Sequence, residues 1–146
     1  MLTFYSRILV AHDGSELSEK ALDMAITLAK QDERIELFVV AVSNPPSAAS
    51  MGSYGIYSQE LIDELRKNTE KLLQGAMEKM KDLPNKATTV VLEGNPGRMI
   101  IEYAKNSNCD LIVMGSRGLN AFAELFLGST SHFVVQRAHC PVFIVK

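Results

Sequence analysis

The sequence predicts an α/β fold: a single domain of residues 1–146 built on an open five-stranded parallel sheet with helices on both faces. Short apolar runs alternate with amphipathic stretches along the chain, which is typical of βαβ units. The apolar runs are nearly continuous, as in strands that helices cover on both sides. A chain of 146 residues, 47% of them hydrophobic, can bury one ordinary core, and no repeat or linker divides it.

The apolar runs are the predicted strands. The first, "SRILVAH", is apolar from Ile8 to Ala11 and is followed at once by polar turn residues. The others share this pattern and are bounded by Gly, Pro, Asn or Asp. The expected strands are residues 6–12, 35–42, 87–94, 110–115 and 140–146.

The stretches between the strands have apolar residues at helical spacing. Asp13 and Ser15 are alternative N-caps for the first helix, and Pro96 suits the first turn of the third. Met24 and Met77 fall on the apolar stripes of the first and second helices, which predicts that both are buried. The expected helices are residues 13–33, 59–81, 96–108 and 129–138.

Charge and composition limit the classes of function. The formal net charge is −2, so no basic field exists to hold nucleic acid. The apolar run near the N-terminus is too short and too interrupted for a leader or a membrane span, and we expect a soluble cytoplasmic protein without membrane contact. Cys109 and Cys140 lack metal-site spacing and adjoin apolar segments. Reduced core thiols are favoured over a disulfide or a redox role.

The residues that follow the first and fourth predicted strands are candidates for a ligand-binding site. Ligands of open α/β sheets bind beyond the carboxyl ends of the strands, where neighbouring strands send the chain to opposite faces. If the first strand is central and the fourth is its neighbour, "HDGS" at 12–15 and "GSRG" at 115–118 face one another. The missing Cβ atoms of Gly115 and Gly118 allow positive φ and let a ligand approach the backbone.

The start of the last helix is rich in glycine and hydroxyl groups. Residues 128–131 read Gly-Ser-Thr-Ser, and such a helix start offers unpaired N–H groups, hydroxyl donors and the positive end of the helix dipole. This pattern favours a phosphate group as ligand. The alternative is structural: Ser129 or Thr130 acts only as the N-cap.

These segments together resemble the universal stress protein family. Gly115-x2-Gly118-x9-Gly128-Ser129 matches the nucleotide-binding signature of that family. "ILVAHDGS", "EGNPGRMIIEYA", "DLIVMGSRG" and "CPVFIVK" are similar to its other recurring segments, in the right order, so the resemblance covers essentially the whole chain.

The resemblance implies strand order 3-2-1-4-5, a homodimer formed through the last strand, and a bound adenine nucleotide, ATP or alternatively ADP or AMP. Asp13 would contact the ribose and the backbone of Val42 the adenine, while the helix start at 128–131 would bind the phosphates. The remaining contacts would come from the two strand exits. The implied nucleotide-binding residues are Ala11, His12, Asp13, Val42, Met114, Gly115, Arg117, Gly118, Gly128, Ser129, Thr130 and Ser131.

Several of these residues have simpler explanations. Asp13 could instead be an N-cap, Arg117 a solvated loop cation, and His12 a residue that only packs in its turn. One histidine beside one aspartate is not a metal site, so no metal ligand and no catalytic residue is assigned.

The sequence therefore predicts an ATP-binding switch or sensor of the stress response that acts on an unknown protein partner, with Mg²⁺ bridging the phosphates. A slow ATPase, or an autokinase that phosphorylates Ser129, Thr130 or Ser131, is the alternative. The sequence contains no P-loop lysine, no Gly-x-Gly-x-x-Gly and no evident base, which ranks binding above catalysis. A dimeric scaffold with an empty pocket is a third possibility.

Overall fold

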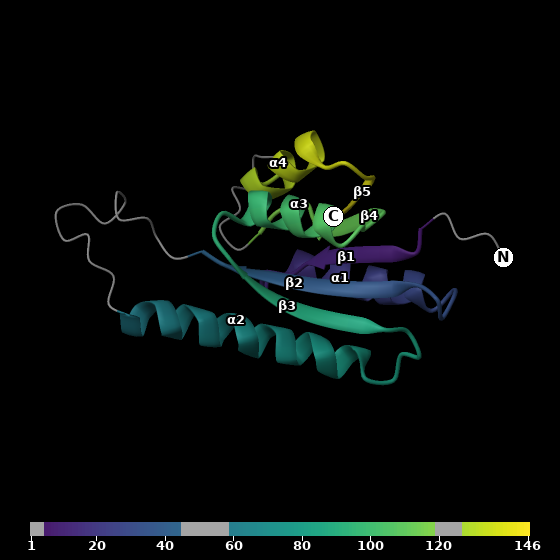
Figure 1. Ribbon diagram of the computed structural model, residues 1–146, viewed down its shortest axis with the longest axis horizontal. Coiled ribbons are helices and arrows are strands. Elements are labelled where there is room, and N and C mark those ends of the chain that lie inside the picture. The colour runs from purple at the N-terminus through teal and green to yellow at the C-terminus, as the bar shows by residue number, and fades with distance from the viewer. Residues whose placement is uncertain (1–4, 45–58, 119–126) are drawn as a thin grey trace.

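Strand pairing places the first strand at the centre of a parallel sheet (Figure 1). The computed structural model describes residues 5–44, 59–118 and 127–146. Within them the sheet has the order β3-β2-β1-β4-β5, and every neighbouring pair is parallel. The predicted fold class and strand order are confirmed. The strands are β1 (Arg7–Ala11), β2 (Glu36–Ser43), β3 (Ala87–Glu93), β4 (Leu111–Gly115) and β5 (Val142–Val145).

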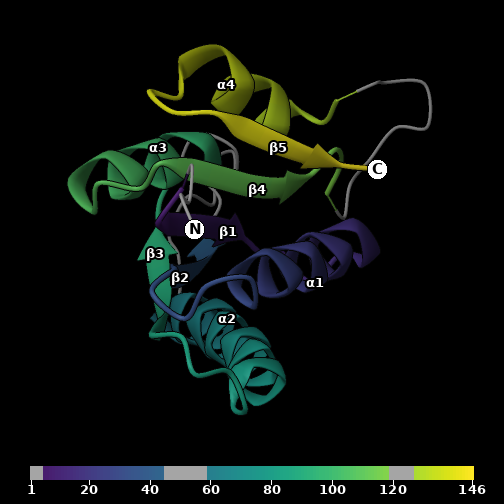
Figure 2. The ribbon, with the colours of Figure 1, turned by 90° about the vertical axis from the view of Figure 1, so that its right-hand side faces the viewer.

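The helices form a layer on each side of the sheet. Figure 2 shows α1 and α2 on one face and α3 and α4 on the other. Ser15, not Asp13, caps α1, because its hydroxyl oxygen accepts a hydrogen bond from the Ser18 N–H at 3.2 Å. Asn95 caps α3 in the same way, directly before Pro96. The helices are α1 (Glu16–Ala29), α2 (Gln59–Met80), α3 (Pro96–Asn106) and α4 (Ser129–Arg137).

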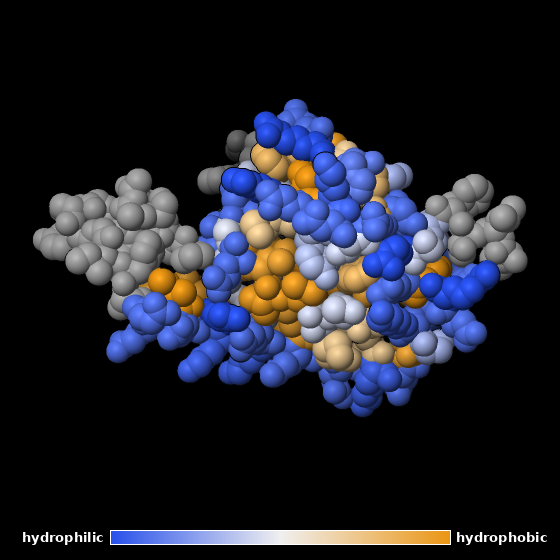
Figure 3. All heavy atoms as spheres, in the orientation of Figure 1, coloured by the Kyte–Doolittle hydropathy of each residue, from blue (hydrophilic) through white to orange (hydrophobic). Residues whose placement is uncertain are grey.

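Alternate residues of the central strands enter two separate cores, as the strand period of two requires. Ile8 and Val10 belong to the core beneath α1 and α2, and Leu9 belongs to the core beneath α3 and α4. All three side chains are fully buried, and each contributes about 1.5–3 kcal/mol of transfer free energy. The second core is less well covered at β2 and β3, where Figure 3 shows apolar side chains gathered on the surface.

Two of the predicted core methionines are exposed, so this part of the prediction is wrong. Met24 is 36% exposed because α1 turns Leu22 and Ala25 toward the sheet instead. Met77 is 45% exposed because it lies over β3, and within the described sheet no further strand lies beyond β3 to cover it. All the buried residues of α2 lie in its second half, and Figure 1 shows its first turns extending past the end of the sheet.

Both cysteines are free thiols. Cys109 is almost fully buried, and desolvation raises the pKa of its thiol to about 12. Burial also raises the pKa of Cys140. Thiols in such surroundings stay protonated and unreactive at neutral pH, in agreement with the expected reduced core thiols. No helix in the described parts of the chain is long and apolar enough to cross a membrane.

Candidate functional site

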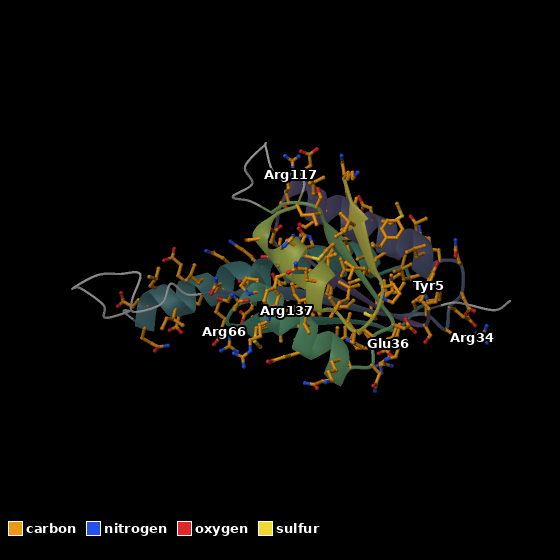
Figure 4. The ribbon with its side chains drawn as sticks, turned by 90° about the horizontal axis from the view of Figure 1, so that it is seen from above. Tyr5, Arg34, Glu36, Arg66, Arg117 and Arg137 are labelled. Atoms are coloured by element: carbon orange, nitrogen blue, oxygen red, sulfur yellow. The ribbon has the colours of Figure 1, made fainter. Side chains whose placement is uncertain are left out.

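A cavity of about 760 Å³ lies at the carboxyl ends of β1, β2 and β4. In Figure 4, Arg117 at the exit of β4 lies far from Tyr5, Arg34 and Glu36, which mark the amino ends of β1 and β2. Every residue that the sequence predicted for a nucleotide site lines this one cavity. They are Ala11, His12, Asp13, Val42, Met114, Gly115, Arg117, Gly118, Gly128, Ser129, Thr130 and Ser131.

Sequence reasoning missed a further wall of the cavity. It consists of one side of α2, the start of α3 and one aromatic ring of α4, which come together only through tertiary packing. The start of α3 was the one part with a usable signal, because "GNPG" also follows the carboxyl end of a strand. The lining residues of this wall are Leu65, Asn68, Thr69, Leu72, Asn95, Pro96, Gly97, Ile100 and Phe133.

The turn after β1 is held by its own side chains. His12 is 2% exposed, and its Nδ1 lies 3.1 Å from the backbone nitrogen of Gly14. Gly14 has φ of +87°, a conformation that side-chain-bearing residues rarely adopt. Asp13 Oδ1 accepts a hydrogen bond from the Ser15 N–H at 2.9 Å. The carboxylate of Asp13 therefore lies at the edge of the cavity as part of an ordered turn.

Close packing explains Gly115, and neither Gly115 nor Gly118 uses the positive φ that glycine allows. Among the described glycines only Gly14 and Gly94 have positive φ. A Cβ atom on Gly115 would lie 2.8 Å from Leu17 Cβ. A Cβ atom on Gly118 would collide with Asp13 Oδ2. The exits of β1 and β4 thus lie in contact: a side chain on Gly115 would have to displace α1 at Leu17, whereas one on Gly118 would have to displace the Asp13 carboxylate.

Gly128, rather than a hydroxyl residue, is the N-cap of α4, and no side chain caps this helix. The alternative that Ser129 or Thr130 serves as the N-cap is therefore wrong. The Gly128 N–H and the Ser131 hydroxyl both donate to the Ser116 carbonyl oxygen, at 2.7 and 2.8 Å. These bonds tie the start of α4 to the exit of β4 while the first-turn N–H groups lack intrahelical partners.

The electrostatics of the cavity come largely from the backbone. Helices α1, α3 and α4 all begin at its rim, so three positive dipole ends converge there. Among the described lining residues, Asp13 is the one carboxylate and Arg117 the one arginine or lysine. The arrangement suits a ligand with an anionic end near α4 and hydroxyl donors near Asp13.

An open parallel sheet with such a cavity beyond its carboxyl edge defines a doubly wound α/β protein. Residues 4–146 match the universal stress protein family, and the chain belongs to that family.

Individual relatives are similar to this chain over nearly its full length. The universal stress protein YxiE of Bacillus subtilis is 37% identical over 97% of this chain and 99% of its own. The structure of hypothetical protein MJ0577 superposes with a TM-score of 0.85 at 25% identity, covering 99% of this chain and 97% of that one. A universal stress protein in complex with cAMP has a TM-score of 0.72 at 27% identity and 99% coverage of both chains.

Gly115 packs tightly against Leu17, whereas Gly75 is exposed. Gly→Ala substitutions at the two positions should therefore change the free energy of unfolding in opposite directions. Gly115→Ala should lower the free energy of unfolding by about 1–3 kcal/mol, because Leu17 Cβ and its carbonyl carbon must shift. Gly75 is exposed on α2, and a Cβ added there would have no other atom within 4 Å, so Gly75→Ala should raise the free energy of unfolding by about 0.5–1 kcal/mol. Urea unfolding of both variants measures the difference. A Gly115→Ala protein as stable as the parent would contradict the close-packing explanation.

Proposed function

We propose that the cavity binds an adenine nucleotide, with ATP as the resident ligand, and that the protein acts as a nucleotide-dependent switch or sensor in the stress response. The observation that carries this proposal is the meeting of the β1 and β4 exits at a cavity where three helices begin. The cAMP complex of a relative supports the adenine nucleotide class.

Each part of the nucleotide is proposed to contact protein groups of matching chemistry. The carboxylate of Asp13 suits the ribose hydroxyls, which are donors, and it would repel phosphate. The backbone of Val42 at the end of β2 is proposed to meet the adenine, and Met114 to pack against the base or sugar. The first-turn N–H groups of α4 and the hydroxyls of Ser129 and Thr130 suit the phosphates.

The same arrangement argues against efficient catalysis. Rapid phosphoryl transfer needs positioned cations and a group that orients the nucleophile. Arg117 is the one arginine or lysine that the described residues bring to the cavity. We therefore propose binding first, with slow hydrolysis or autophosphorylation of the hydroxyl cluster as the alternative that the experiment below separates.

The output of the switch is proposed to pass through a homodimer and an unidentified protein partner. In the described sheet β5 is an edge strand, so its outer backbone groups are placed to pair with a second copy. We propose that nucleotide occupancy changes the affinity of this dimer for its partner.

The resident nucleotide is the first prediction to test. Mass spectrometry of small molecules released by denaturing freshly purified protein should find ATP at close to one molecule per chain. Incubation with γ-labelled ATP should leave no label on the protein and release no phosphate over many hours. Recovery of ADP or AMP alone would favour slow hydrolysis or a different resident nucleotide, and stoichiometric labelling of the Ser129–Ser131 segment would favour the enzymatic alternative.

The position of the phosphates predicts the effect of Gly128→Val. A Cβ at this position would lie 3.4 Å from Arg117 Cα, in ordinary contact, so the fold should be kept. The branched side chain would fill space between the start of α4 and the exit of β4, and ATP binding measured by calorimetry should be lost. Gly75→Val, outside the cavity, is the matched control and should bind normally. Unchanged affinity in a folded Gly128→Val protein would refute this site.

Charge balance predicts a role for Mg²⁺. A triphosphate brings several negative charges to a cavity with one arginine, and Mg²⁺ coordinates phosphate oxygens without needing many protein carboxylates. Chelation with EDTA should therefore weaken ATP binding several-fold and leave AMP binding nearly unchanged. An equal response of both nucleotides would argue against metal bridging.

A further inference from the structure

We propose that Glu19 is a positioning residue for the cavity: it fixes the proton of His12 on Nε2, and His12 in turn holds the Gly14 turn that presents Asp13. Glu19 itself is not among the residues that line the cavity. The expected effect on ligand affinity rests on the proposed nucleotide binding, whereas the effect on the turn does not.

Both ring nitrogens of His12 have partners. Nδ1 lies 3.1 Å from the Gly14 nitrogen and 3.2 Å from Ser18 Oγ. Nε2 lies 3.1 Å from Glu19 Oε1. The His12 side chain is fully buried, so these protein groups take the place of water around the ring.

The partners determine where the proton sits. A backbone N–H can only donate, so the bond from Gly14 requires a lone pair on His12 Nδ1. A neutral ring with a lone pair on Nδ1 carries its proton on Nε2, which then donates to the Glu19 carboxylate. A proton on Nδ1 would oppose the Gly14 N–H and break the bond that closes the turn.

Lysine 79 of α2 completes the arrangement. Lys79 Nζ lies 2.6 Å from Glu19 Oε2 and 3.1 Å from Asp23 Oδ1. The hydrogen bond from Lys79 is the largest of the influences that lower the pKa of Glu19, and Glu19 in turn raises the pKa of Lys79, so both are charged at neutral pH. The Glu19 carboxylate, which Lys79 holds in place, can therefore accept a hydrogen bond from the Nε2–H group of His12.

A chain of contacts thus runs from the surface to the cavity. Lys79 and Glu19 are about two-fifths exposed, His12 is buried, and Asp13 borders the cavity. Helix α2 also lies beside the turn itself, since a Cβ on Gly14 would lie 3.5 Å from Leu72 Cδ1. The turn that carries Asp13 is therefore set by α1 and α2 together.

Nitrogen-15 NMR of the histidine rings tests the proton assignment. In the full-length protein His12, identified by its loss in His12→Asn, should show the Nε2–H tautomer. A two-bond coupling across the hydrogen bond should link its Nδ1 to the Gly14 amide nitrogen. A proton on Nδ1, or the absence of that coupling, overturns the proposal without reference to any ligand.

Variants of Glu19 test the positioning role. Glu19→Leu should give a mixture of His12 tautomers, lose the coupling to Gly14 and weaken ATP binding about fivefold, the loss typical of one hydrogen bond. Glu19→Gln keeps a carbonyl oxygen as acceptor and should restore both the tautomer and the affinity. Glu16→Leu makes the same change at an exposed position of α1 and should alter neither.

The outcomes separate this proposal from the proposed function. If the parent binds ATP and Glu19→Leu retains the Nε2–H tautomer and full affinity, the positioning role is wrong and nucleotide binding stands. If the parent binds no ATP but Glu19→Leu loses the Gly14 coupling, the control of the turn is supported and the nucleotide assignment fails.

Discussion

The close approach of the β1 and β4 exits is the constraint on which the site depends. Adjacent parallel strands here send their helices to opposite faces, α1 to one and α4 to the other, which opens a crevice between the exits. Because Gly115 and Gly118 have no side chains, the β4 exit can pack directly against Leu17 of α1 and Asp13 of the β1 exit. Wider separation of the exits would move the Ser116 carbonyl oxygen, which ties the start of α4 to the sheet.

Much of the fold followed from sequence patterns because most strands are nearly continuous apolar runs and because α1 and α3 each begin at a side-chain N-cap. Helix burial was harder to predict. Met77 lies on the apolar stripe of α2, yet it is exposed because β3 is the edge of the sheet. Spacing within a helix records which residues share a face, but it does not tell how far the sheet beneath that face extends.

All the predicted site residues line one cavity, but Gly115 and Gly118 do not have the positive φ that glycine allows. The spacing of Gly115 and Gly118 marks a place where side chains do not fit, and sequence alone could not distinguish unusual φ from close packing. The hydrogen bonds of His12 could not be predicted from the sequence either. They depend on Glu19 one helical turn into α1 and on Lys79 in another helix, and neither residue follows a motif.

With one carboxylate and one arginine among its described lining residues, the cavity depends on correctly placed backbone groups more than on charged side chains. Backbone N–H groups keep their dipoles whatever the pH, but their direction is set by turns that other side chains hold. The Ser131 hydroxyl holds one such turn through Ser116, and His12 holds another through Gly14. Among the described residues, the second turn is connected to the surface through Glu19 and Lys79, so under the proposed positioning role an event that displaces Lys79 from Glu19 would act on the β1 turn. Such an event would act on the Asp13 side of a bound ligand, where the sugar is proposed to lie, and would not require the phosphate-binding end to move.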